Sequence, residues 1–220
     1  MSVPFATRSS APFWFFLLLL IGVAGFWRSY FARFAAVDPA HHFHSLTALS
    51  WMALLLAQGA LARSRRFVLH RRLGRLSYVL APLFLLAGAR MIVALLAGTD
   101  AFARAHGARL VPVDVVALAA FALLFAQAIR HRRDPARHAR YMAGTGVLLL
   151  SPALARLLPL LGSVRGFEAT IDGAFLLTEL LVLACLYLDR PGGRLQPPHL
   201  VLLASTLVQH LVFHAPQLLS

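Results

Sequence analysis

Long runs of apolar residues, separated by short basic segments, make up most of this chain of 220 residues. A helix needs about 20 mostly apolar residues to cross the hydrocarbon core of a bilayer. The expected spans lie near residues 12–30, 42–62, 74–97, 111–130, 141–162, 170–188 and 199–218. They leave no room for a soluble domain. The pattern therefore predicts an all-α fold, in which residues 1–220 form one transmembrane domain of seven helices.

The composition supports a membrane protein. Hydrophobic residues make up 60% of the chain and charged residues 13%, with a mean hydropathy of +0.74. A soluble domain carries roughly twice that share of charge. The first apolar run follows Arg8, as in a signal peptide, but no small-residue cleavage site follows it cleanly. Phe26-Trp27-Arg28 is typical of an interfacial anchor, so we expect the first span to be retained.

The net charge of +13 comes from arginine alone, since the chain has no lysine. Fourteen arginines fall on one side of the expected membrane: those in segments 63–75 and 130–140, together with Arg8, Arg190 and Arg194. Five fall on the other side: Arg28, Arg33, Arg104, Arg109 and Arg165. Because basic loops stay in the cytoplasm, this asymmetry places the N-terminus inside and the C-terminus outside.

The basic loops also indicate a partner. In a soluble protein such a charge would suggest nucleic acid. Between membrane spans it predicts contact with the lipid bilayer and its anionic head groups, and no nucleic-acid partner. The use of arginine alone and the abundance of alanine suggest a high-GC genome, so we expect a multi-pass protein of a bacterial cytoplasmic membrane. Association into a homo-oligomer stays open.

Histidines gather at two places that the topology puts at one depth. His41 and His44 open the second span, and His210 and His214 lie near the end of the last. Residues three or four apart share a helix face, and neutral imidazole suits zinc, copper and iron. We therefore expect His44 and at least one of the two last-span histidines to share a metal ion. The expected ligands are His41, His44, His210, His214, Asp114 and Asp172.

Other ionisable residues lie within the spans, mainly in the outer half. Arg90 and Arg156 are deep in the third and fifth spans, and charged groups in a membrane must be paired. Their expected partners are Asp114, Asp172 and Glu179. Two interpretations remain open. These charges only hold the helices together, or they line an outward-facing polar cavity whose arginines bind an anionic group.

Two further histidines, His70 and His138, open spans at the basic boundary beside Arg71 and Arg140. One interpretation is contact with lipid phosphate. The other is a second site, for haem propionates or a quinone head group. The candidate cofactor-binding residues are accordingly Arg90, Arg156, His70 and His138, and the candidate cofactors are a divalent transition metal and haem b.

Leu69-His70-Arg71-Arg72-Leu73-Gly74, preceded by the histidine-rich helix start, resembles a family of short bacterial multi-pass membrane proteins without an assigned activity. Pro112-Val113-Asp114 and the segment 137–142 extend the resemblance, which implies the architecture more than a function. His-Arg-x-x-Gly-Arg is also similar to a turn in ferric-reductase-like haem membrane domains. His-x-x-x-His in the last span is similar to the intramembrane zinc hydrolases of the ceramidase and adiponectin-receptor superfamily.

Three functions therefore stay open. The first is a metal- or haem-binding membrane protein, with redox activity as one form. The second is a small-molecule transporter or carrier. The third is an assembly or interaction protein without a catalytic role. The chain contains no phosphate-binding glycine loop, no nucleophile elbow and no His-Glu-x-x-His, so the sequence does not decide whether it is an enzyme.

Overall fold

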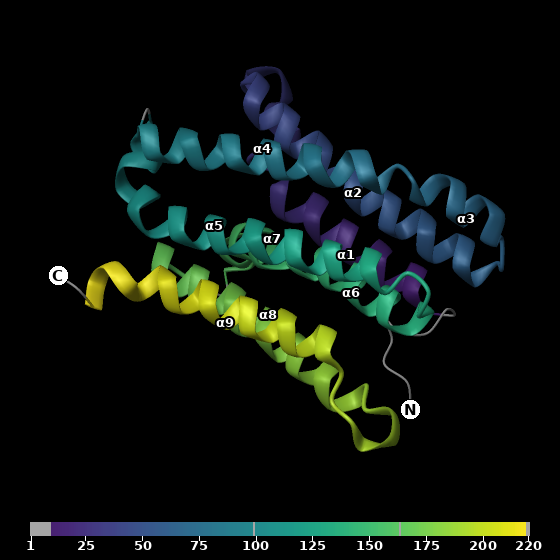
Figure 1. Cartoon of the computed structure of the whole chain (residues 1–220). Helices are drawn as coiled ribbons and strands as arrows, with labels where there is room; N and C mark the ends of the chain where they lie inside the picture. Colours follow the sequence, from purple (N-terminus) through teal and green to yellow (C-terminus); the bar gives the residue numbers. More distant parts are fainter. Residues whose placement is uncertain (1–9, 99, 163, 219–220) are drawn as a thin grey trace.

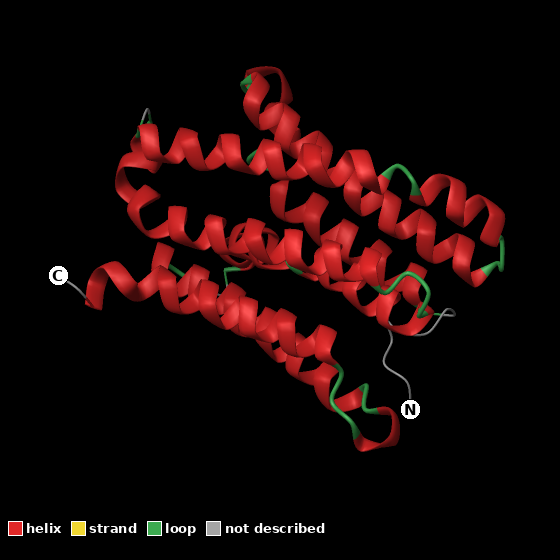
Figure 2. Cartoon of the chain, viewed as in Figure 1, coloured by secondary structure: helices red, strands yellow, loops and turns green. Residues whose placement is uncertain are grey.

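A computed structural model describes residues 10–98, 100–162 and 164–218, and these ranges contain helices but no strand (Figure 2). The α-helices are α1 (Ala11–Phe26), α2 (Pro39–Arg63), α3 (Phe67–Gly74), α4 (Ser77–Ala97), α5 (Ala101–Arg130), α6 (Pro135–Val147), α7 (Leu150–Leu157), α8 (Phe167–Leu188) and α9 (Pro197–Leu218). Short 3-10 helices occupy Phe31–Ala36, Leu158–Leu161 and Pro191–Gly193. Arg8, counted above among the cytoplasmic arginines, lies outside the described residues.

Six helical segments are long and apolar enough to cross a membrane. They are Pro39–Arg63, Phe67–Ala97, Ala101–Arg130, Pro135–Leu161, Phe167–Leu188 and Pro197–Ala215. The first helix, α1, has 16 residues, which at 1.5 Å per residue span about 24 Å. The hydrocarbon core is about 30 Å thick. The chain is therefore a multi-pass helical membrane protein, and the seventh span stays a prediction.

The helices form a bundle around α5 (Figure 1). This helix packs on α4 at one side and on α9 at the other, while α1 lies against α2 and α7. Trp51 is fully buried in the core, where its ring meets Phe121 at a centroid distance of 5.0 Å. The indole Nε1–H donates to the Thr145 hydroxyl at 3.1 Å. The tryptophan thus ties α2 to both α5 and α6.

The aspartates Asp38, Asp100 and Asp134 begin three of the long helices as N-caps. Their carboxylates accept hydrogen bonds from backbone N–H groups that have no partner within the helix. The bond from the Arg137 N–H is the main reason why the pKa of Asp134 lies below its usual value. The cap at Asp100 also corrects the fourth predicted span. The helix begins at Ala101, not near residue 111, and continues through Pro112.

Two other boundaries differ from the prediction. The third span begins at Phe67, because the basic turn before residue 74 is itself helical. The fifth is interrupted between Val147 and Leu150, where α6 ends and α7 begins.

Close packing of α1 on α7 requires Gly25, since a Cβ there would lie 2.4 Å from the carbonyl oxygen of Ala153.

A reporter fusion tests the orientation and the seventh span together. A reporter joined after Ser220 is expected to be active outside the cytoplasm, and one inserted at Arg133 inside it, because of the arginine asymmetry. A reporter ahead of Met1 should be active inside only if α1 crosses the membrane. An external N-terminal signal would reduce the count to six spans, and reversed signals at the other two positions would overturn the orientation.

Candidate functional site

Helices α8 and α9 pack against each other and bring three of the expected ligands together (Figure 1). Asp172 lies on α8, and His210 and His214 lie one turn apart on α9. One donor atom from each residue falls within 4.8 Å of the other two. All three residues are partly buried. Of the groups expected from the sequence, this is the one that the fold assembles.

The separations of the donor atoms suit one small cation. The Asp172 Oδ1 atom lies 2.8 Å from His214 Nε2 and 3.3 Å from His210 Nε2. A tetrahedral zinc ion with ligands at about 2.0 Å keeps those ligands about 3.3 Å apart. The separation from His210 equals this spacing, whereas the separation from His214 is that of a hydrogen bond and would have to lengthen by about 0.5 Å on metal binding.

The second ring nitrogen of His210 faces another carboxylate. Its Nδ1 lies 3.2 Å from Glu179 Oε1, and Glu179 is buried, with 8% of its surface exposed. A neutral imidazole has only one N–H group, so it cannot donate to both carboxylates. In the tautomer that donates from Nδ1 to Glu179, the Nε2 lone pair is left to bind a cation.

Apolar residues pack around these polar groups. Phe175 lies parallel to the His210 ring at a centroid distance of 5.1 Å. It forms a buried cluster with Val113 and Phe213. Packing against Phe175 restricts the orientation of the His210 imidazole.

Arg109 of α5 lies beside the same helix pair, and the sequence analysis placed it in a loop. Its Nη1 donates to Glu168 Oε1 at 2.6 Å, its Nε donates to the carbonyl oxygen of Phe213 at 3.2 Å, and Cζ lies 4.0 Å from the Phe213 ring centre. It is the one arginine hydrogen-bonded to this group of acids among the described residues. Three carboxylates, on Glu168, Asp172 and Glu179, therefore lie near one guanidinium and two imidazoles.

The expected partner from α2 is not part of this group. Helix α2 packs on α1, α3, α4 and α6, whereas α9 packs on α5, α6 and α8. His44 instead stacks on Phe84 at 5.6 Å between centroids, and its buried Nδ1 has no hydrogen-bond partner among the described residues. His41 is exposed and bonds the Asp38 carboxylate. Asp172, not His44, supplies the third donor.

The arginines of the outer half do not form the expected ion pairs with described residues. The Arg90 side chain is exposed and has no charged partner in the described ranges. Arg156 lies over the Phe26 ring at 4.4 Å and donates to the carbonyl oxygen of Pro152 at 2.9 Å. Its charge still interacts with that of Asp114 on α5. The structure thus does not gather these residues around the α8–α9 site.

His70 and His138 have similar positions at the arginine-rich end of the bundle, because each contacts a backbone carbonyl of the preceding long helix. Nδ1 of His70 lies 3.3 Å from the carbonyl oxygen of Gln58, and Nδ1 of His138 lies 2.9 Å from that of Ala128. In each case a histidine near the start of a span satisfies a carbonyl near the end of the preceding helix. This accounts for both residues structurally.

A second buried polar cluster lies at the arginine-rich end of α8 and α9. Asp189 accepts two hydrogen bonds from Arg140, at 2.5 and 2.7 Å, and lies 2.8 Å from His199 Nε2. Burial alone would raise the pKa of Asp189, but the hydrogen bonds from Arg140 and His199 outweigh it and hold the pKa below its usual value. This cluster joins α6, α8 and α9, and a cavity of about 20 Å³ lies beside it.

Comparison with protein-family models, with curated proteins and with solved structures found no match to the chain. The geometry of these clusters therefore carries the functional argument, and the resemblances drawn from sequence motifs remain predictions.

Proposed function

We propose that this multi-pass membrane protein binds one divalent transition metal ion, with zinc as the first choice, between α8 and α9. Asp172, His210 and His214 are the ligands, and Glu179 orients His210. The observation that carries the proposal is the position of His210, whose Nε2 faces the other donors while Nδ1 faces a buried carboxylate. Metal-binding histidines are commonly held in this way by a carboxylate behind the ring.

Charge and ligand chemistry support the same conclusion. Three carboxylates, on Glu168, Asp172 and Glu179, outnumber the guanidinium of Arg109, and such an acidic group suits a divalent cation. Two imidazole nitrogens and one carboxylate oxygen suit zinc, and also iron(II). Three protein ligands leave a position for water or a substrate, which is typical of catalytic rather than structural zinc sites.

A metal ion fits these residues better than haem. Two axial histidines of one haem must lie on opposite faces of the porphyrin, whereas His210 and His214 lie one turn apart on one helix, with ring centroids separated by 5.7 Å. The other expected cofactor histidines, His70 and His138, are engaged with backbone carbonyls. We accordingly propose a membrane metalloprotein of the bacterial cytoplasmic membrane and do not pursue the haem hypothesis.

The test is a metal titration of protein purified in detergent and stripped with a chelator. Zinc is expected to bind at about one equivalent per chain with micromolar or tighter affinity, measured by calorimetry and by metal analysis after gel filtration. Binding at well below one equivalent would refute the proposal. His210 would then be an imidazolium held between two carboxylates, with a purely structural role.

Glu179→Gln is expected to weaken zinc binding by about 10- to 100-fold, as is usual when a carboxylate behind a metal-binding histidine is lost. Glutamine keeps the size of the side chain but supplies no negative charge for the His210 N–H. The matched control is Glu168→Gln on the same face of α8, where the carboxylate bonds Arg109 and not a ligand. An equal loss of affinity in both variants would indicate a general charge effect instead of orientation of His210.

A further inference from the structure

The turn between α2 and α3 carries a concentration of positive charge without protein counter-charge. Six arginines lie in segment 63–75, and no acidic residue occurs between Asp38 and Asp100. None of the six makes an ion pair with a described residue. The turn can therefore accept an anionic group from outside the described residues.

The eight acidic residues of the chain are all placed elsewhere. Asp38, Asp100 and Asp134 cap helices, Glu168 bonds Arg109, Asp172 and Glu179 face His210, Asp189 bonds Arg140, and Asp114 lies near Arg156 on α5. The turn thus differs from the other arginine-rich end segments, in which Asp134 pairs with Arg137 and Asp189 with Arg140.

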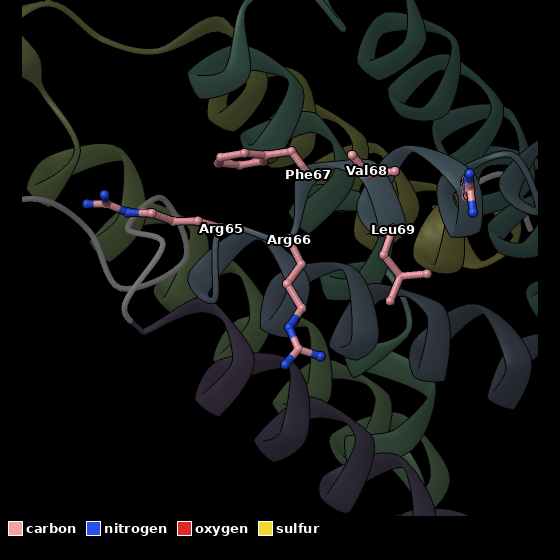
Figure 3. Close-up of a pocket in the computed structure, with 6 residues that line it drawn as sticks. Arg65, Arg66, Phe67, Val68 and Leu69 are labelled. Carbon is pink, nitrogen blue, oxygen red and sulfur yellow. The ribbon is translucent and has the colours of Figure 1, made fainter.

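A hollow of about 330 Å³ lies at this turn (Figure 3). Three arginines and three apolar residues line it: Arg65, Arg66, Arg72, Phe67, Val68 and Leu69. Figure 3 shows the side chains of Arg65 and Arg66 pointing in different directions around the turn. The lining therefore combines cationic groups with an exposed apolar surface, as a ligand with a charged head and an apolar body would require.

The backbone at Arg65 adds a second observation. Its φ is +57°, in the left-handed region that residues with side chains seldom adopt. The Arg66 N–H bonds the carbonyl oxygen of Leu61 at 2.9 Å, so the turn is a helix C-terminus of the kind that normally uses glycine. An arginine stands here in place of glycine, and its side chain lines the hollow. Backbone strain of this kind is common where a side chain is needed for binding.

We infer from helix length that the turn lies at the depth of the lipid head groups. Helix α4 alone has 21 residues, which span about 32 Å at 1.5 Å per residue, and α3 adds a further eight residues before it. The hydrocarbon core is only about 30 Å thick. One end must protrude, and the arginine-rich α3 is the polar end, whereas α4 is apolar throughout most of its length.

We propose that this hollow binds the head group of an anionic phospholipid from the adjacent leaflet. One of the lining guanidinium groups would hold the phosphate, while Phe67, Val68 and Leu69 supply an apolar surface beside it. Guanidinium groups form strong hydrogen bonds with phosphate oxygens. The proposal is independent of the metal site, which lies towards the opposite end of the bundle (Figure 1).

The test compares two triple variants that remove the same charge from the same end of the protein. Arg65→Gln/Arg66→Gln/Arg72→Gln alters the hollow, and Arg130→Gln/Arg132→Gln/Arg133→Gln alters the neighbouring basic turn. Native mass spectrometry of delipidated protein in detergent measures binding of phosphatidylglycerol, with phosphatidylcholine as the uncharged reference. Far-UV circular dichroism and the midpoint of thermal unfolding in detergent establish that each variant is folded.

The wild-type protein is expected to hold one phosphatidylglycerol more tightly than phosphatidylcholine. The hollow variant should lose affinity for it by about tenfold or more, since each basic group near the membrane surface contributes measurably to anionic-lipid binding. The control should lose less than about twofold. Equal losses of phosphatidylglycerol affinity in both variants would show that the lipid responds only to the total positive charge of this end of the protein. That result would overturn the proposal. Complete competition by millimolar inorganic phosphate would also overturn it, because the site would then recognise free phosphate.

Discussion

Replacing Asp189 by asparagine is expected to lower the midpoint of thermal unfolding in detergent by about 6–20 °C. The substitution removes the carboxylate that neutralises Arg140, whose side chain is 10% exposed. Losing one partner of a buried ion pair costs about 3–5 kcal/mol, and each kcal/mol is worth about 2–4 °C in a chain of this size. His199 would lose its partner at the same time.

Asp134→Asn is the matched control. Asp134 lies at the same end of the bundle and also faces an arginine, Arg137, at 3.5 Å, but both side chains are about half exposed. Exposed ion pairs contribute about 0–1 kcal/mol, and asparagine caps a helix as well as aspartate does. Its unfolding midpoint should therefore stay close to that of the wild type. A comparable fall of the unfolding midpoint in both variants would show that the stabilising effect of Asp189 does not depend on its burial.

A double replacement separates the ion pair from packing. Asp189→Asn together with Arg140→Gln leaves no unpaired charge in the ion pair, so it should destabilise the protein less than Asp189→Asn alone.

The stabilising contribution of Asp189 should also depend on pH. Because the pKa of Asp189 is lowered in the folded protein, its stabilising contribution is present above about pH 4. It is lost as the pH falls through the folded-state value.

The helices were predictable because each apolar run is long and continuous. Their ends were less so. Asp100 begins a helix ten residues before the predicted start, and the predicted boundary coincided with Pro112, which the helix accommodates. A proline is a weak boundary signal within a membrane, because neighbouring groups can satisfy the carbonyl that it frees.

Part of the candidate site followed from spacing alone. His210 and His214 are four residues apart and had to share a face, and Asp172 lies on the preceding span, which packs antiparallel against theirs. His44 was expected at the same depth but belongs to the other side of the bundle. Depth in the membrane follows from the sequence, whereas the order of helices around α5 depends on tertiary packing that no local pattern contains.

Asp189 and Arg109 were missed for a related reason. Both lie where the sequence suggested exposed connections, and the fold buries them between helices. Asp189 did carry a signal, since acidic residues are scarce at the arginine-rich end of this protein. One of only two carboxylates among many arginines is a strong candidate for an ion pair, and the position of Asp189 directly after an apolar run indicates the end of a span.

Replacing both last-span histidines, His210→Ala with His214→Ala, is expected to reduce bound zinc to less than about one tenth of an equivalent. Two of the three ligands would be lost, and a single carboxylate binds zinc weakly in water. In wild-type protein, zinc at 100 times its dissociation constant should stabilise the fold by about 2.7 kcal/mol. This corresponds to about 5–11 °C in the unfolding midpoint, and the variant should lose that zinc-dependent shift.

The chain offers a closely matched control in His41→Ala with His44→Ala. These histidines also share a helix face near one end of a span, but they lie on α2, which does not pack on α8 or α9. Zinc stoichiometry and the zinc-dependent shift should both be retained in this control, because α2 does not contribute a donor to the α8–α9 site. Loss of zinc in the control would instead support the metal site predicted from the sequence, in which His44 shares an ion with a histidine of the last span. Retention in the α9 variant would exclude His210 and His214 as ligands.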